Sequence, residues 1–199
     1  MRIDSLTLHH ISMPLVAPFE TSFGRETERE CIIITLQSEG LTGYGECVAS
    51  REPGYNYETT GTAWHILKEF IAPLVWGEHI TDALDFQRRV ERIRGHHLAK
   101  AGVEMAIWDL LGKRDGKSLK EMFGGTKEKV EVGVSIGIQE SAAALVRTVE
   151  SYLAKGYRRV KIKIKPGRDD EETVAVRKKY PDLRLQVDAN SAYTLENAS

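Results

Sequence analysis

The spacing of apolar residues divides the chain into segments with different expected structures. In the first fifty residues apolar and polar positions alternate, which predicts three β-strands, at 5–14, 31–37 and 41–49. From 58 to 116 the apolar residues recur every three or four positions, as in amphipathic helices, and Thr81 is expected to cap one of these helices. The turn G-G-T-K at 124–127 ends this segment and is the best candidate for a domain boundary.

Beyond residue 128, strand and helix patterns alternate. The pattern predicts strands at 130–138, 158–164 and 183–188, helices at 141–155 and 169–179, and the start of another helix at Leu195. Strands and helices joined by short links are typical of a parallel sheet with crossover helices. Each of these strands has one apolar face and one polar or small face, whereas doubly wound sheets tend to be apolar on both faces. The pattern therefore favours a barrel with helices on the outside.

Polar residues recur near the carboxyl ends of these three strands. Ser135, Lys163 and Asp188 are each separated by about one strand–helix unit. In barrels of this kind the carboxyl ends of the strands carry the chemistry, so these side chains are expected to converge on one pocket. Asp188 could hold a hard cation such as Mg²⁺, although a single aspartate at a strand end is more often simply solvated.

Three lysines alternate with apolar residues in V-K-I-K-I-K-P-G, at 160–167. They share one face of the expected strand, where repulsion and burial would lower the pKa of a lysine and make it a base. Lys163, nearer the strand end, is the candidate base, with Lys161 one layer deeper and Lys165 expected to turn toward solvent. The alternative is an edge strand protected by lysines, and Asp188 one strand away favours the site.

Two expected loops hold aromatic residues, although loops usually carry polar ones. The first, P-F-E-T-S-F-G at 18–24, contains Phe19 and Phe23, and the second, S-R-E-P-G-Y-N-Y at 50–57, contains Tyr55. The aromatic side chains either pack back onto the core or form a hydrophobic lid over a site.

Composition narrows the class of protein. The 199 residues are 41% hydrophobic and 29% charged, which is typical of a soluble globular protein. A formal net charge of −1 gives no drive toward nucleic acid or an anionic membrane. No apolar run approaches the length that spans a bilayer, and the first thirteen residues lack the apolar core of a signal peptide, so a cytoplasmic protein is expected. Cys31 and Cys47 are expected to be buried, reduced and unreactive.

Several stretches, in order along nearly the whole chain, resemble the enolase superfamily. They are M-P-L-V-A-P-F-E-T-S-F-G, G-Y-G-E-C-V-A, H-L-A-K-A-G-V-E-M-A-I-W-D, V-G-V-S-I-G-I, G-Y-R-R-V-K-I-K-I-K-P-G and L-Q-V-D-A-N-S-A-Y-T-L. The most similar branch holds o-succinylbenzoate synthase and N-succinylamino acid racemase (also called N-acylamino acid racemase). The combination of K-x-K with D-A-N one strand–helix unit later is specific, whereas either motif alone is weak.

The resemblance implies a fold and a catalytic centre. The expected fold is an α+β capping domain over 1–126, with a three-stranded antiparallel sheet plus helices. The first three strands of a (β/α)7β TIM-like barrel would follow over 127–199. In this family the residue at Lys163 is the acid/base on the carbon next to a carboxylate, and the residue at Lys161 supports it. Asp188 matches the first of three carboxylate ligands to Mg²⁺, for which Mn²⁺ or another divalent cation can substitute.

The resemblance also implies a set of substrate-binding positions. Asn190 matches a position near metal and substrate, and Ser135 resembles a substrate-contacting position on the first barrel strand. Phe19, Phe23 and Tyr55 lie on the loops that in this family close over the substrate. The expected partner is a small-molecule carboxylate, with no nucleic acid and no membrane, and the full-length protein is expected to be a homo-oligomer.

The family's shared chemistry is proton abstraction to a metal-stabilised enediolate. The resemblance implies a lyase, o-succinylbenzoate synthase, which performs a syn dehydration in menaquinone biosynthesis and in some cases also racemises N-succinylamino acids. Alternatives are a racemase as the main activity, or a truncated, non-enzymatic capping or assembly module. Dipeptide epimerase and muconate cycloisomerase match less well. The family's other two metal ligands and its second lysine lie beyond Ser199, so we expect residues 1–199 to be a fragment that is inactive and poorly stable alone.

Overall fold

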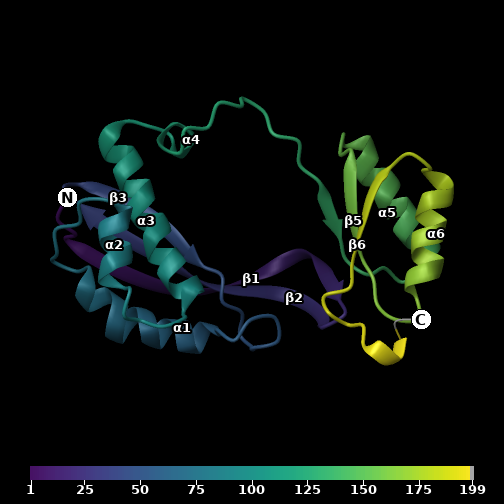
Figure 1. Cartoon of the computed structure of the whole chain (residues 1–199), viewed down its shortest axis with the longest axis horizontal. Helices are drawn as coiled ribbons and strands as arrows, with labels where there is room; N and C mark the ends of the chain where they lie inside the picture. Colours follow the sequence, from purple (N-terminus) through teal and green to yellow (C-terminus); the bar gives the residue numbers. More distant parts are fainter. Residues whose placement is uncertain (198–199) are drawn as a thin grey trace. The chain divides into compact units, whose positions relative to one another are not determined.

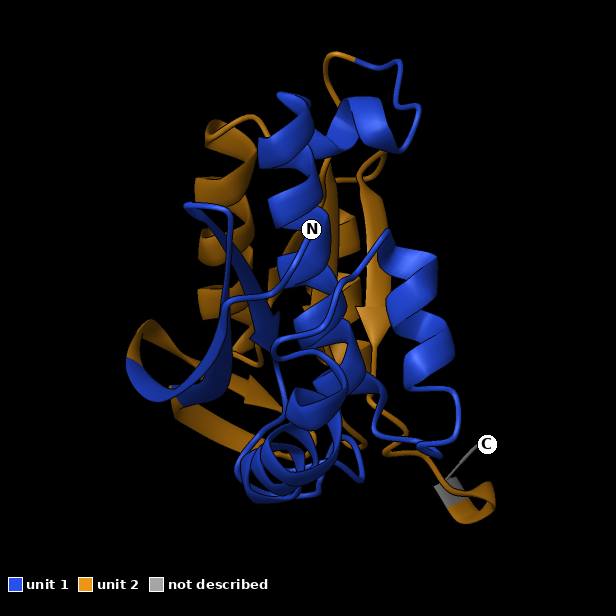
Figure 2. Cartoon of the chain, turned by 90° about the vertical axis from the view of Figure 1, so that its left-hand side faces the viewer, with its two compact units in different colours: residues 1–13, 29–127 blue, residues 14–28, 128–199 orange. Residues whose placement is uncertain are grey.

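The computed structural model describes residues 1–197 of the chain, which form two compact units (Figure 1). The first unit comprises residues 1–13 and 29–127, and the second comprises residues 14–28 and those from 128 onward (Figure 2). Each unit has its own hydrophobic core. The expected division at residue 126 into a capping domain and a barrel segment stays a prediction, and each unit is described by itself.

An antiparallel sheet of three long strands begins the chain. Its strands, in the order β1-β2-β3, are β1 (Ser5–Thr21), β2 (Gly24–Ser38) and β3 (Leu41–Cys47). Glycines in β3 let the sheet approach a helix backbone closely. A Cβ at Gly45 would lie only 1.9 Å from the carbonyl oxygen of Gly102, and one at Gly43 would lie 2.3 Å from that of Ala106. Only glycine fits this backbone-to-backbone contact.

Helices complete the first unit. They are α1 (Thr60–Ile66), the π-helical turn η1 (Leu67–Ile71), the 3-10 turn η2 (Ala72–Leu74), α2 (Ala83–Arg89), α3 (His97–Asp115) and α4 (Leu119–Met122). The predicted Thr81 cap is wrong by one residue, because Asp82 accepts from the backbone N–H of Asp85 at 2.8 Å. The π turn shifts the helical register, so Phe70 is exposed while its neighbour Ile71 is buried.

The core of the first unit lies between the sheet and α1, α2 and α3. Fully buried members include Ile34, Leu67, Phe86, Ile107 and Leu110. Cys31 and Cys47 are buried and free, and burial raises the pKa of each thiol to about 11. The expectation of buried thiols is therefore confirmed, and their lack of reactivity stays a prediction.

The second unit contains a parallel sheet in the order β4-β5-β6, as predicted. Its elements are β4 (Val134–Ile136), α5 (Ala142–Ala154), β5 (Arg159–Lys163), α6 (Asp169–Lys179), β6 (Arg184–Asp188) and the 3-10 turn η3 (Leu195–Asn197). Ser141 caps α5 by accepting from the backbone N–H of Ala144. Helices α5 and α6 lie side by side against the sheet (Figure 1), and Val149 and Val176 join Val160 and Ile162 in one buried cluster.

The strand predicted at 130–138 is shorter than expected. Val130 and Val132 are 71% and 64% exposed and lie outside β4. The reason is pairing, since β5 begins at Arg159 and its ladder with β4 starts at Val134 opposite Val160. Residues 130–132 have the apolar and polar alternation of a strand, but they pair with no strand among the described residues.

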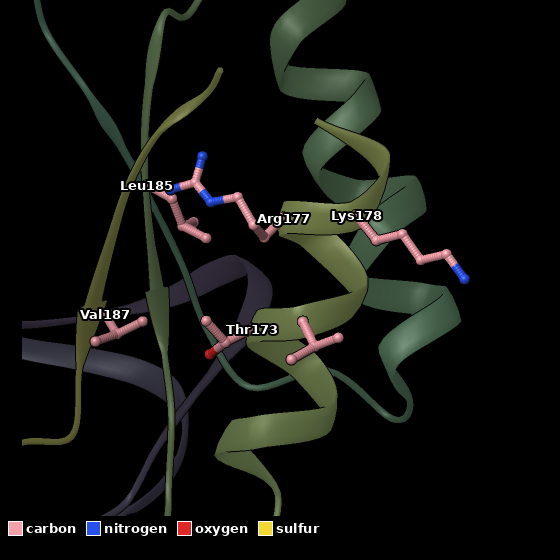
Figure 3. A pocket seen from close by; sticks show the side chains of 6 residues that line it. Thr173, Arg177, Lys178, Leu185 and Val187 are labelled. Carbon is pink, nitrogen blue, oxygen red and sulfur yellow. The ribbon is translucent and has the colours of Figure 1, made fainter. Parts of the chain in front are cut away.

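A groove of 480 Å³ lies between α6 and β6 (Figure 3). It is lined by Thr173, Val174, Arg177, Lys178, Leu185 and Val187. Val187 is the register partner of Ile162, so the groove opens on the apolar face of the sheet, opposite the lysines. Among residues 1–197, no helix combines the length and the apolar character needed to cross a bilayer.

Candidate active site

Lys163 and Asp188 face each other as register partners on β5 and β6. Lys163 Nζ lies 2.8 Å from Asp188 Oδ2 and 2.6 Å from Asn190 Oδ1, and the lysine is buried. Lys161 Nζ reaches the same Asp188 oxygen at 2.9 Å. The sequence argument from repulsion between lysines was incomplete, because this carboxylate lies between the two ammonium groups and attracts both.

The environment of Asp188 strongly favours its ionised form. Hydrogen bonds from Lys163 and then Lys161 hold the pKa of Asp188 far below its usual range, and the backbone N–H of Asn190 adds a third donor at 3.0 Å. The carboxylate therefore stays charged throughout the physiological pH range.

The turn after β6 brings Asn190 back over the strand end. Asn190 and Ser191 have φ angles of 49° and 62°, in the left-handed region that asparagine tolerates better than most residues. The backbone N–H of Asn190 donates to Asp188 while its side-chain oxygen accepts from Lys163. The D-A-N motif thus closes a small ring of hydrogen bonds around the lysine.

The segment predicted as a loop at 18–24 is instead the end of a β-hairpin. Strand β1 continues to Thr21 and β2 begins at Gly24, so only Ser22 and Phe23 form the turn. Strand β1 contains Pro14 and Pro18, and it lies at the edge of the sheet, where proline is tolerated.

The hairpin end carries Phe19 and Phe23 into the second unit. Phe19 is half-buried beside Gly137, and Phe23 at the turn is 55% exposed. Ser22 Oγ donates to the carbonyl oxygen of Ala189 at 2.7 Å, next to Asp188.

Glu20 is the residue that sequence reasoning missed. Its carboxylate accepts from Lys165 Nζ at 3.3 Å, so the prediction that Lys165 turns to solvent is wrong. The two residues are 145 positions apart, beyond the reach of any local pattern.

Ser135 and Tyr55 are the remaining predicted substrate-binding residues. Ser135 is the register partner of Lys161, so it lies on the polar face one layer below Lys163 and Asp188. Tyr55 belongs to the first unit and is 79% exposed. Its role toward substrate stays a prediction.

Oxygen ligands for a divalent cation are present but few. Asp188 offers one carboxylate and Asn190 one amide oxygen, which suit Mg²⁺. Within residues 1–197, no three side chains of the types His, Cys, Asp or Glu cluster as a metal site would require. The described residues therefore fit one carboxylate ligand of such a site, and they do not form a complete one.

The sequence and the fold have close counterparts among known proteins. Curated relatives include o-succinylbenzoate synthase of Geobacillus kaustophilus, 45% identical over 199 residues, and N-succinylamino acid racemase of Thermus thermophilus, 44% identical over 197. These alignments cover 100% and 99% of the chain but 53% of each relative, so the chain spans about half the length of the curated relatives it matches.

A solved structure also matches nearly all of this chain and about half of its own length. The crystal structure of an enolase superfamily member from Listeria innocua is 43% identical and superimposes with a TM-score of 0.91, covering 98% of this chain and 53% of that one. This likeness confirms the expected fold, a capping sheet with helices followed by the parallel strands that begin a barrel. Residues 4–124, more than half of the chain, match the family described as mandelate racemase / muconate lactonizing enzyme, N-terminal domain. The chain therefore belongs to the mandelate racemase / muconate lactonizing enzyme family of the enolase superfamily.

Proposed function

We propose that this chain is the first half of a Mg²⁺-dependent o-succinylbenzoate synthase, a lyase that removes water from a cyclohexadiene carboxylate in menaquinone biosynthesis. The observation that carries the proposal is the group formed by Lys163, Asp188 and Asn190 at the carboxyl ends of adjacent parallel strands. The similarity to o-succinylbenzoate synthases at 45% identity supports this choice of reaction.

Lys163 is the residue we assign to proton transfer. Its buried amine lies on a rigid strand, and Asp188 and Asn190 fix the position of Nζ. In the dehydration, Lys163 Nζ takes the proton from the carbon next to the substrate carboxylate. The electron pair then forms the new double bond as the C–O bond breaks, and the leaving hydroxide takes a proton from Lys163 on the same face and departs as water.

Lys161 and Asp188 support this step. Lys161 shares Asp188 Oδ2 with Lys163, so it balances the carboxylate when Lys163 is neutral. A divalent cation bound through Asp188 and ligands from outside residues 1–197 would stabilise the negative charge that develops on the substrate carboxylate. Ser135, Asn190, Phe19, Phe23 and Tyr55 are the proposed substrate-binding residues.

Racemisation of N-succinylamino acids is the second candidate, because a racemase is 44% identical to this chain. Racemisation needs a second acid/base on the opposite face of the substrate carbon. Lys161 and Lys163 alternate with apolar residues on one face of β5, so they serve only one face of a substrate. The described residues fit the proton abstraction that begins either reaction.

The test is an assay of the protein expressed from its complete reading frame with Mg²⁺. The purified protein is given the cyclohexadiene substrate of o-succinylbenzoate synthase and, separately, a panel of N-succinylamino acids. Dehydration that stops on chelation with EDTA supports the synthase. Racemisation without dehydration supports the second candidate, and absence of both reactions refutes the proposed function.

A further inference from the structure

The end of the β1–β2 hairpin contacts the chain directly after each of the three parallel strands of the second unit. After β4, the backbone N–H of Ile138 donates to the Glu20 carbonyl oxygen at 2.9 Å. After β5, Lys165 pairs with the Glu20 carboxylate, and after β6 the carbonyl oxygen of Ala189 accepts from Ser22. One short segment therefore bridges the strand ends where the candidate active site lies.

The first of these contacts involves a close backbone approach at Gly137. A Cβ at Gly137 would lie 3.0 Å from both the backbone nitrogen and the carbonyl oxygen of Glu20, and 3.3 Å from the ring of Phe19. The hairpin backbone is thus seated against the end of β4, with Phe19 packed beside it. This contact sets the distance between the hairpin backbone and the strand ends.

The ion pair between Lys165 and Glu20 is the contact that solvent can weaken. Its side chains are 37% and 32% exposed, so dissolved salt screens the attraction, whereas the backbone hydrogen bond is insensitive to charge. Lys161 and Lys163 both share Asp188, which leaves Lys165 as the lysine of the stripe that the proposed chemistry does not use.

We propose that Glu20 and Lys165 are positioning residues that hold the hairpin end, residues 19–23, against the strand ends and so set the position of Phe19 for substrate. The pair itself does not react. The anchoring stands on the contacts described above, and only its consequence for substrate rests on the proposed function. Loss of the pair leaves the backbone and Ser22 contacts in place, so the hairpin loosens without unfolding.

Hydrogen exchange on the complete protein tests the anchoring directly. Glu20→Gln and Lys165→Met keep side-chain size and remove one charge each, and Glu20→Lys with Lys165→Glu exchanges the two charges. We expect amide exchange in residues 14–28 to rise on the order of 2- to 5-fold in the single variants and to return near the wild-type rate in the charge-exchanged double variant. Glu140→Gln, an exposed carboxylate near the end of β4, is the matched control and should change nothing.

Two results would overturn the anchoring: unchanged exchange in Glu20→Gln, or no recovery in the charge-exchanged pair. Added salt provides a second readout, because it should accelerate exchange in the wild type and have little further effect in Glu20→Gln. A merely structural hydrogen bond would not show this dependence on salt.

Steady-state kinetics of the complete enzyme test the consequence for substrate. Glu20→Gln should raise KM a few-fold with kcat changed less than twofold, since the chemistry at Lys163 is untouched. A fall in kcat at constant KM would contradict the positioning role. If exchange responds as expected but the wild-type enzyme has neither proposed activity, the proposed function fails while the anchoring stands. If the wild-type enzyme is active but exchange does not respond as expected, the anchoring fails while the proposed function stands.

Discussion

Lys163 and Asp188 occupy the same register position on neighbouring parallel strands, with 2.8 Å between Nζ and Oδ2. Strand pairing places the two residues opposite each other, so the acid/base candidate and the candidate metal ligand are held together on the paired strands of the second unit. A site built on strands keeps its geometry better than one built on loops.

Replacing Lys163 with methionine should abolish activity of the complete enzyme while preserving the fold. Methionine fills the buried position but cannot transfer a proton, so we expect kcat to fall at least about 100-fold. Lys178→Met, on the exposed surface of α6, is the matched control and should keep wild-type activity. A Lys163→Met enzyme with more than about a tenth of wild-type kcat would not fit general base catalysis by this residue.

Replacing Asp188 with asparagine should destabilise the second unit. The amide cannot balance Lys161 and Lys163, whose like charges would then face each other across a neutral group. We expect a loss of about 1 to 2 kcal/mol in the free energy of unfolding, measured by urea denaturation of the complete protein. Asp182→Asn, on the exposed turn before β6, is the control. Adding Lys161→Met to Asp188→Asn should recover part of the loss, and failure to do so would argue against charge repulsion as its cause.

Replacing Gly137 with alanine tests the close contact between the hairpin and β4. The added methyl group meets backbone atoms of Glu20 at 3.0 Å, and backbone cannot rotate away as a long side chain can. We expect the hairpin to shift, with faster amide exchange in residues 14–28 and a stability cost of about 1 to 3 kcal/mol. Gly54→Ala has open space around its Cβ and should be neutral. Equal behaviour of the two variants would mean that the hairpin does not rest on Gly137.

The helices of the second unit could be predicted from local signals, and the hairpin could not. Helix α6 begins and ends where its periodicity and charges place it, at Asp169 and Lys179, and Ser141 caps α5 as its position indicates. A cap or an apolar stripe involves residues a few positions apart. The outer part of β1 and β2 is a strand only because the two segments pair with each other, and the R-E-T-E-R run of β2 has no apolar alternation to reveal it.

The same limit applies to the candidate site. Lys163, Asp188 and Asn190 could be predicted because parallel strands bring their carboxyl ends to one edge of the sheet. Glu20 could not, because its contact with Lys165 depends on where the hairpin lies in three dimensions. Strand β4 was predicted too long because alternation says that a segment can form a strand, and only a partner strand makes it one.

Acid should remove the stabilisation that Asp85 provides to the first unit. Burial opposes ionisation of Asp85, but hydrogen bonds from Arg89 and from the Thr81 backbone N–H outweigh it and lower the pKa of Asp85. A carboxyl whose folded pKa lies below its unfolded value, about 3.9, stabilises the protein above the unfolded pKa, and this stabilisation is lost as pH falls through the folded pKa. Asp85→Asn should therefore cost on the order of 1 kcal/mol at pH 7 and progressively less below about pH 4. Urea denaturation across pH measures the difference, and a constant difference down to about pH 2 would contradict it.

Glu58 should be essential for the start of α3. This buried carboxylate accepts from the backbone N–H groups of Leu98 and Ala99, at 2.8 and 3.1 Å, and the local cap residue His96 makes no side-chain capping hydrogen bond to the helix. Replacing Glu58 with alanine leaves two donors of the first turn without an acceptor, so we expect a loss of about 2 to 3 kcal/mol in the free energy of unfolding. Glu58→Gln keeps one acceptor oxygen and should cost less, and Glu52→Gln on the exposed loop should cost nothing measurable.

Because Glu58 ends the segment that carries Tyr55, Glu58→Ala should also speed tryptic cleavage after Arg51. Unchanged cleavage would mean that the loop is held by its bridge between Ser50 and Thr59 alone.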